Sequence, residues 1–203
     1  MGDTNGNGLA EVIVGWPIST VGARDDAGAV VSIVGRSSGL SASGARILHQ
    51  NTPGVPEVAE TGDHFGASIA AGDVTGDGRA DVVVGVPEEN KYDRVNVGAF
   101  TLLKGSSVGL TGVGSQYFDQ NTTGVPGTAE TNDRFGDVVT LLDLNGDGKR
   151  DAAVGDRWED SDRGTVTLFR GSSTGLTPTE LITAASLSTP EIQLFAFGGS
   201  IAQ

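Results

Sequence analysis

Three short stretches of this chain place oxygen-bearing side chains at one common spacing. They run from Asp3 to Glu11, from Asp73 to Asp81 and from Asp143 to Asp151, with oxygen donors at positions 1, 3, 5 and 9. Each has glycine at position 6, which permits the sharp turn that lets alternate side chains converge. Calcium takes six to eight such oxygens at roughly 2.3–2.6 Å. We therefore predict one Ca²⁺ site in each stretch, three per chain.

Each predicted site combines four side chains with the backbone carbonyl of position 7. The predicted metal ligands are Asp3, Asn5, Asn7, the Leu9 carbonyl and Glu11; Asp73, Thr75, Asp77, the Arg79 carbonyl and Asp81; and Asp143, Asn145, Asp147, the Lys149 carbonyl and Asp151. The first loop has two carboxylates, whereas the other two have three each. We expect the first loop to bind calcium most weakly.

An EF-hand loop and a plain turn are the two other interpretations of these stretches. An EF-hand needs a bidentate Glu at position 12 and flanking helices. Here position 12 is Val14, Val84 or Val154, within β-branched or small apolar runs that favour strands. Single clusters of Asp, Asn and Gly are often plain turns. Three copies at one spacing, each before a strand signal, favour metal binding.

Composition limits the classes of partner. The net charge is -13, and eight of the acids belong to the three loops, so three bound calcium ions would cancel six charges. This acidity argues against nucleic acid or an anionic membrane as partner. Cysteine is absent, which excludes a disulfide framework. No apolar run approaches the 18 residues of a membrane span, and no signal peptide precedes Asp3.

The loops belong to a longer internal repeat. Phe65-Gly precedes the second loop by the same distance as Phe135-Gly precedes the third. After each loop we expect a strand, a second strand that begins near Ala29, Ala99 or Thr165, and a last strand. The last strands are predicted at 45–49, 116–119 and 180–184. Four-stranded units that cannot bury their own faces are typical of the blades of a β-propeller. The chain is thus predicted to be all-β, as one propeller segment of three blades.

The pattern Phe-Gly, then Gly-Asp-Val-Thr-Gly-Asp-Gly-Arg-Ala-Asp, then Val-Val-Val-Gly-Val-Pro resembles the FG-GAP repeat of integrin α-subunit propellers and their bacterial relatives. The resemblance covers essentially the whole chain. It implies a propeller of seven or a similar number of blades, with calcium between the first two strands of a blade. It also implies an extracellular setting for the natural parent.

The first blade is predicted to be split between the two ends of the chain. Phe197-Gly-Gly-Ser-Ile-Ala-Gln203 followed by Gly2-Asp3 matches the stretch from Phe65 to Asp73, apart from Gly199 and Gln203 in place of alanines. Blade 1 would comprise residues 1–60 completed by strand 197–203, blade 2 residues 61–130 and blade 3 residues 131–190. Since propellers typically need four to eight blades to close, we expect a homodimer in which exchange of strand 197–203 gives a six-bladed ring.

Two function classes follow, with a third behind them. The chain is expected to be a calcium-binding scaffold that self-associates. Alternatively, it is an extracellular recognition module whose face loops, with Tyr92 and Trp158, bind a protein or a glycan. Catalysis is not expected, because His49 and His64 lie in no evident constellation with a nucleophile or acid. An appendage of a secreted hydrolase is the third reading. The repeated segments that begin at Gln50 and Gln120 are expected to link blades.

Overall fold

The computed structural model describes residues 1–159, 163–187 and 197–201 of the chain. Within them, eleven strands and one 3-10 helix follow each other in sequence. They are β1 (Val12–Trp16), β2 (Ala29–Arg36), β3 (Gly39–Leu48), β4 (Ser68–Gly72), β5 (Asp81–Val86), β6 (Ala99–Lys104), β7 (Thr111–Phe118), β8 (Val138–Leu142), β9 (Asp151–Asp156), β10 (Thr165–Ser172), β11 (Gly175–Thr183) and η1 (Ala184–Leu187). None of the helices in this described part is long and apolar enough to cross a membrane.

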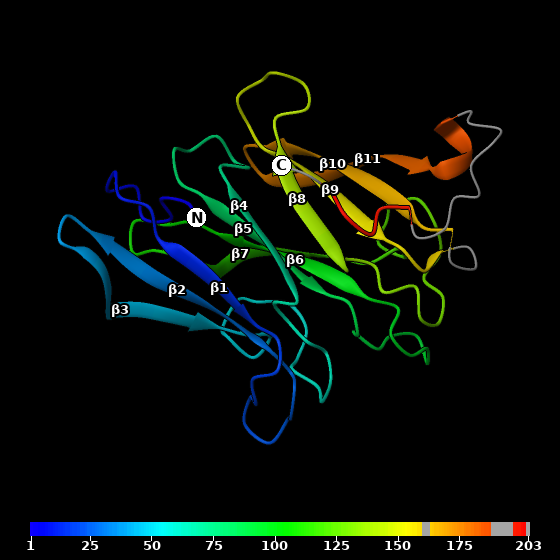
Figure 1. Cartoon of the computed structure of the whole chain (residues 1–203), viewed down its shortest axis with the longest axis horizontal. Helices are drawn as coiled ribbons and strands as arrows, with labels where there is room; N and C mark the ends of the chain where they lie inside the picture. The colour runs from blue at the N-terminus through cyan, green and yellow to red at the C-terminus, as the bar shows by residue number, and fades with distance from the viewer. Residues whose placement is uncertain (160–162, 188–196, 202–203) are drawn as a thin grey trace.

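The strands form three antiparallel sheets that lie side by side as a fan (Figure 1). Blade 2 has the order β4-β5-β6-β7 and blade 3 the order β8-β9-β10-β11, each a simple meander. Blade 1 has only β1-β2-β3. Its missing first strand corresponds to β4 and β8. In the described structure one edge of β1 is therefore without a neighbouring strand, as the split blade predicts.

The last strand of each blade is longer than predicted, which corrects those boundaries. The predicted strands 45–49, 116–119 and 180–184 are the ends of β3, β7 and β11, which begin at Gly39, Thr111 and Gly175. Gly44 and Gly114 adopt φ of 89° and 77°, and the register shifts at the same part of each ladder. Glycines at β-bulges look like loop residues in a sequence, which is why the strands were predicted too short.

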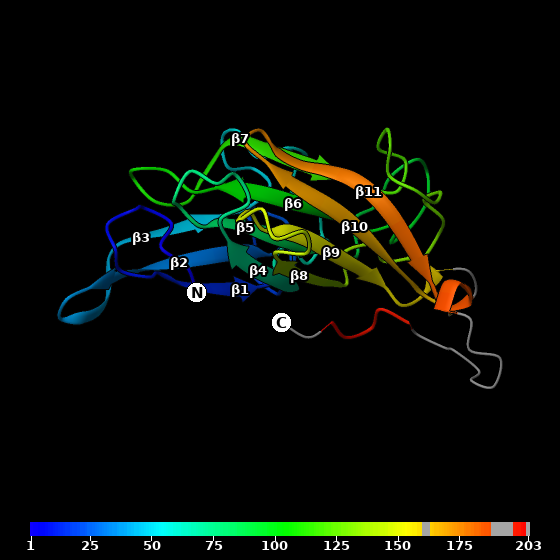
Figure 2. The ribbon, with the colours of Figure 1, turned by 90° about the horizontal axis from the view of Figure 1, so that it is seen from above.

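The hydrophobic core lies between neighbouring sheets. Between blades 2 and 3, Phe100 stacks on Phe118 with ring centroids 5.0 Å apart and meets Phe169 in a T-shaped, edge-to-face contact at 4.9 Å, with Phe135 beside them. Between blades 1 and 2 the core is mostly aliphatic. The run Val82–Val84 of β5 is fully buried because both faces of its sheet are covered. Each blade is thus stabilised by its neighbours (Figure 2).

The Phe-Gly motif attaches each blade to the one before it. Backbone N–H of Phe65 donates to the Ala27 carbonyl at 2.9 Å, and that of Phe135 donates to the Val97 carbonyl at 3.1 Å. The glycine of the motif also packs closely on the preceding blade. A Cβ on Gly85 of blade 2 would lie 2.1 Å from the carbonyl oxygen of Gly136. Phe-Gly therefore packs on the preceding blade, although in sequence it begins the following one.

Candidate metal-binding loops and blade junctions

The three predicted calcium loops have the same hairpin geometry. Each joins the first strand position of a blade to the second, and the aspartate at position 1 organises it. In loop 2, Asp73 Oδ1 accepts hydrogen bonds from the Gly76 and Asp77 N–H groups, and Asp73 Oδ2 accepts one from Gly78 at 2.8 Å. Asp3 and Asp143 hold the equivalent N–H groups of their own loops. The position-1 carboxylates thus fix the curl of each loop.

The acids at position 9 are buried beneath the loops. Asp81 Oδ2 accepts from Thr75 N–H and its hydroxyl, both at 3.2 Å, while Asp81 Oδ1 accepts from Gly105 N–H at 3.0 Å. Asp151 bonds Leu144 and Gly171 in the same way. Gly105 directly follows β6, and Gly171 lies near the end of β10, the third strands of their blades. Position 9 therefore ties each loop to the opposite hairpin of its own sheet.

Loop 1 differs in how its position-9 acid is satisfied. Glu11 Oε2 accepts from Thr4 N–H and Thr4 hydroxyl, both at 2.8 Å. Glu11 Oε1 accepts from the Asn5 side-chain amide at 2.6 Å. An amide hydrogen thus faces the carboxylate within this loop, where a cation would otherwise supply positive charge. This geometry supports the expectation that loop 1 binds metal most weakly.

Three of the loop carboxylates, Asp3, Asp81 and Asp143, have shifted pKa values. Burial alone raises the pKa of Asp3, but hydrogen bonds from Gly8, Gly6 and Asn7 N–H bring it below its ordinary value. The pKa of Asp143 is lowered in the same manner by the N–H groups of its loop. Burial raises the pKa of Asp81, against hydrogen bonds from Gly105 and the nearby Lys104 ammonium, which lower it. The lowered pKa values favour the ionised form of Asp3 and Asp143, which is the form that would bind a cation.

The donor set fits calcium, although the ligands are only partly gathered. Each loop offers carboxylate, amide or hydroxyl oxygens within nine residues, which is the hard-oxygen chemistry of calcium. In the described part of the chain, no three His, Cys, Asp or Glu side chains converge as a preformed metal cluster. The position-7 side chains of Arg79 and Lys149 turn back to Asp77 and Asp147, at 3.1 and 3.9 Å.

Successive loops contact each other through the backbone. Ala80 N–H, at position 8 of loop 2, donates to the Asp3 carbonyl at 2.8 Å. Arg150 N–H, at the same position of loop 3, donates to the Asp73 carbonyl at 2.8 Å. Each loop thereby positions the residue that begins the loop before it. The three candidate metal sites form a connected row along one rim of the fan.

A second repeated feature joins the blades at the opposite rim. Gln50 Nε2 of blade 1 donates to Glu89 Oε2 of blade 2 at 2.7 Å, and Gln120 Nε2 donates to Glu159 Oε2 of blade 3 at 2.8 Å. The expectation that the segments from Gln50 and Gln120 link blades is confirmed. Sequence reasoning missed the acids that they reach, because Gln and Glu lie 39 residues apart.

These junctions hold acids with strongly raised pKa values. Burial, helped by the nearby Asp63 charge, raises the pKa of Glu89 to about 8. Burial likewise raises the pKa of Asp156 to about 8, and that of Asp63 to about 6. Raised pKa values also mark catalytic acids, but here Glu89 and Asp156 accept hydrogen bonds from glutamines of the preceding blades, and Asp63 accepts one from Glu60 N–H. We assign these carboxyls to blade packing.

The aromatic residues of the face loops have different environments. Trp158 stays 39% exposed, with the Arg157 guanidinium 5.1 Å from its ring centroid. Tyr92 is half exposed, and its hydroxyl donates to Asp119 Oδ2 at 2.9 Å. Trp158 is thus partly exposed to solvent in the described structure, whereas Tyr92 is anchored by a hydrogen bond.

Comparison with known proteins agrees with this architecture. A family model described as the FG-GAP repeat matches residues 65–103, which span Phe65-Gly66, loop 2 and the next two strands. A solved rhamnogalacturonan lyase from Bacillus licheniformis shares the fold, with a TM-score of 0.50 and 14% identity over 94% of this chain and 34% of that one. The chain is an FG-GAP repeat protein with an all-β propeller fold.

Its relatives by sequence include integrin α-subunits and a phospholipase. Integrin alpha-PS3 of Drosophila melanogaster is 30% identical over 145 residues, which is 70% of this chain and 12% of that protein. Mouse integrin alpha-IIb is 39% identical over 57% of this chain and 11% of its own length. Bovine phosphatidylinositol-glycan-specific phospholipase D is 32% identical over 55% of this chain. The chain spans only 14% of the phospholipase.

Proposed function

We propose that this chain is a calcium-stabilised, extracellular propeller scaffold that closes its ring with a second copy of itself. The position of Phe197-Gly198 carries the proposal. Phe197 N–H donates to the Arg163 carbonyl at 3.0 Å, as Phe65 and Phe135 do on their own preceding blades. A Cβ on Gly155 would lie 2.1 Å from the Gly198 carbonyl, the same approach as between Gly85 and Gly136.

This contact directs the following residues toward a further blade. After Phe65-Gly66 the chain forms β4, the first strand of blade 2, from Ser68. Residues 197–201 form a turn with no strand of their own, and 202 and 203 lie outside the described residues. The strand predicted over 197–203 thus stays a prediction. On this proposal it forms only when the open edge of β1 in another copy pairs with it.

The polar links at the junctions favour a second copy as the neighbour of blade 3. Blade 3 has no segment like Gln50-Asn-Thr to offer a glutamine, and blade 1 has Ser19 where blades 2 and 3 have Glu89 and Glu159. Blade 3 thus lacks the glutamine donor and blade 1 lacks the acid acceptor. The two absences match if blade 3 of one chain packs on blade 1 of another. Two chains would then give six blades, within the range in which propellers close.

Calcium would be held by the loop ligands and would supply positive charge among their carboxylates. The test is the solution mass from light scattering, in millimolar calcium and after chelation. We expect about twice the 20.6 kDa chain mass in calcium, and a lower or broader mass after chelation. A monomer at all concentrations in calcium would overturn the self-associating scaffold.

A recognition module is the second candidate function. The exposed Trp158 beside Arg157 is the observation in its favour, because an exposed ring can stack on a sugar or cover a basic side chain. Glycan-array binding that is lost in Trp158→Ala and kept in Tyr92→Phe would support it. The likeness to a phospholipase leaves an appendage of a secreted hydrolase as a third, weaker proposal.

A further inference from the structure

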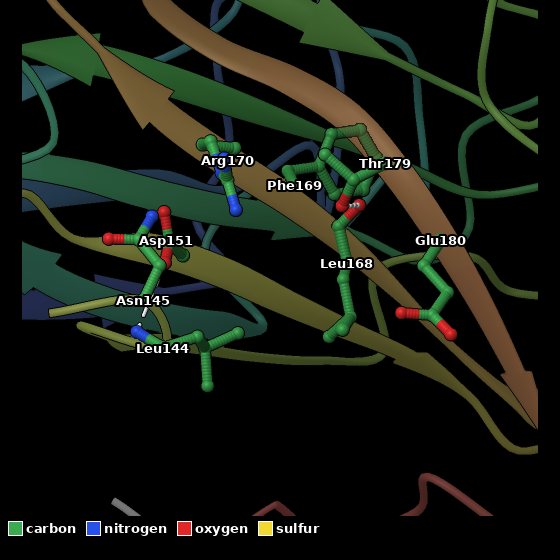
Figure 3. Close-up of a pocket in the computed structure, with 8 residues that line it drawn as sticks. All are labelled: Leu144, Asn145, Asp151, Leu168, Phe169, Arg170, Thr179 and Glu180. Atoms are coloured by element: carbon green, nitrogen blue, oxygen red, sulfur yellow. Dashed lines mark hydrogen bonds between the residues drawn. The ribbon is translucent and has the colours of Figure 1, made fainter. Parts of the chain in front are cut away.

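An open groove of about 410 Å³ lies on the outer side of blade 3 (Figure 3). It runs between loop 3 and strands β10 and β11. Its lining residues are Leu144, Asn145, Asp151, Leu168, Phe169, Arg170, Thr179 and Glu180. Figure 3 shows the Leu168 side chain between those of Leu144 and Glu180. Leu144 is exposed, whereas Thr4 and Val74, at the same position of loops 1 and 2, are fully buried.

The corresponding grooves of blades 1 and 2 are already filled, each by a hairpin turn of the next blade. In blade 1, Ser106 N–H of the β6–β7 turn donates to the Thr4 carbonyl at 3.0 Å. In blade 2, Gln116 holds the β10–β11 turn: its Oε1 accepts from Leu176 N–H at 2.8 Å, and its Nε2 donates to the Leu176 carbonyl at 3.3 Å. Leu110 and Leu176, which end these turns, are buried.

The equivalent turn of blade 1 is the one that contacts no groove in the described chain. It joins β2 to β3 through Arg36-Ser-Ser-Gly-Leu40, and Leu40 is 61% exposed. In the described chain, the groove of blade 3 is thus not filled by a hairpin turn, and the β2–β3 turn of blade 1 does not fill a groove.

The register of the strands identifies the residue that would hold this turn. Glu180 pairs with Leu168 as Gln116 pairs with Leu102, so Glu180 occupies the place of Gln116. A carboxylate there can accept the Leu40 N–H, as Gln116 accepts that of Leu176. The turn of blade 1 also has Arg36 where the other two turns have Ser106 and Ser172. Arg170 and Asp151 line the groove as well, and Figure 3 places both away from Glu180, which is the acid on the β11 side.

From these matches we propose that the blade 3 groove is the docking site for the Arg36–Leu40 turn of a second copy of this chain, with Leu40 seated against Leu144 and Leu168 and Glu180 holding the turn. The inference rests on the proposed function, because it names the contact that closes the dimer. The charge match favours a second copy over an unrelated partner. Among the three blades, only blade 3 has an acid, Glu180, at this strand position, and only the turn of blade 1 begins with a basic residue, Arg36.

The experiment compares Leu40→Asp with Val108→Asp. Val108 is 66% exposed on the β6–β7 turn, so the two changes place the same charge at similarly exposed turn positions. In 5 mM calcium, we expect Leu40→Asp to weaken self-association at least ~30-fold, because it would bury an unpaired carboxylate. Val108→Asp should associate like the wild type. Circular dichroism checks that both variants fold.

A charge exchange tests the role of Glu180. Glu180→Arg and Arg36→Glu should each weaken association about 5-fold, and the double variant should regain most of the loss. Association of Leu40→Asp equal to that of Val108→Asp would overturn the docking site while leaving the dimer intact. A wild type that never associates would instead overturn the proposed function, so the two failures are distinguishable.

Discussion

Blades 1 and 2 follow one sequence pattern, yet their surroundings differ. Val84 of β5 is fully buried, whereas Val14, at the same position of β1, is 41% exposed. Leu110 is fully buried, and its counterpart Leu40 is open. Blade 2 has a neighbour on each side and blade 1 has one. Burial in this fold is therefore a property of the neighbouring blade as much as of the residue itself, as expected when each repeat contacts only its neighbours.

The largest effect expected from this comparison is at the two valines. Val84→Asp should destabilise the protein by about 3 kcal/mol or more, because a carboxylate would enter a closed core. Val14→Asp should change the unfolding of the monomer by less than ~1 kcal/mol and should abolish self-association. Urea unfolding and light scattering of both variants measure this. Equal losses of stability would show that the two positions are alike in the monomer.

The next effect is the pH dependence of stability, which Glu89 of blade 2 should cause and Ser19, at the same position of blade 1, should not. Glu89 has a folded pKa of about 8, above its ordinary value of 4.5, because it is buried and faces Asp63 and Glu57; the Gln50 hydrogen bond and the Lys91 charge act in the opposite direction. A raised pKa means that the folded state binds the proton more tightly. Its contribution to stability is therefore complete below about pH 4.5 and is lost as the pH rises to about 8.

Glu89→Gln should remove that part of the pH dependence. At pH 9 the variant should be more stable than the wild type by up to about 5 kcal/mol, since the pKa rises from 4.5 to about 8 and each pH unit corresponds to about 1.4 kcal/mol. A residual slope should remain, because Asp63 and Asp156 also have raised pKa values. Ser19→Ala serves as the control and should leave the slope unchanged. Parallel pH profiles for Glu89→Gln and wild type would contradict the assignment.

A smaller effect compares the calcium loops. With affinities of about 10⁻⁴–10⁻³ M, 10 mM calcium should add about 1.4–2.7 kcal/mol for each site. Asp81→Asn should remove most of that gain for loop 2. Glu11→Gln should remove less than ~0.5 kcal/mol, because Asn5 already faces Glu11.

Each loop variant is compared with itself in chelator, so structural loss of the Asp81–Gly105 bond cancels. Differential scanning calorimetry with and without calcium gives both values. A larger calcium-dependent loss in Glu11→Gln than in Asp81→Asn would reverse the proposed order of the loops.

The smallest effect is at Tyr92, whose place in blade 1 is taken by Gly22. Tyr92→Phe removes only the hydrogen bond to Asp119 and should cost about 0.5–1.5 kcal/mol. Urea unfolding measures the loss. No change in stability would mean that the bond from the Tyr92 hydroxyl to Asp119 is no stronger than its bonds to water in the unfolded chain. The loop of blade 2 would then be no better anchored than that of blade 1.

Much of this arrangement was predictable because the repeat is strong. The loops, the β-branched strands after them and the Phe-Gly positions all have fixed spacing, so three blades and the free edge of β1 followed from the sequence. The early starts of β3, β7 and β11 did not, because Gly44 and Gly114 resemble loop residues and are instead at bulges. Short-range spacing predicts the hairpins, whereas bulges depend on the ladder that forms around them.

The junction acids escaped prediction for a different reason. Nothing in the local sequence marks Glu89 as buried, and the Gln50 side chain that bonds it comes from another blade. The same holds for Asn5, whose ligand role stays a prediction and whose side-chain amide donates to Glu11 in this structure. Pairing within and between blades decides whether a polar side chain serves a cation, a backbone group or another side chain.

The attachment of Phe-Gly to the preceding blade bears on how the chain acquires its structure during synthesis. Because Phe65 and Phe135 complete the blades before their own, a blade gains its last contacts only after the first residues of the next repeat have been made. The unit that becomes stable is therefore offset by one dipeptide from the unit that is repeated in the sequence. Fragments cut directly after Phe-Gly should fold better than fragments cut just before it.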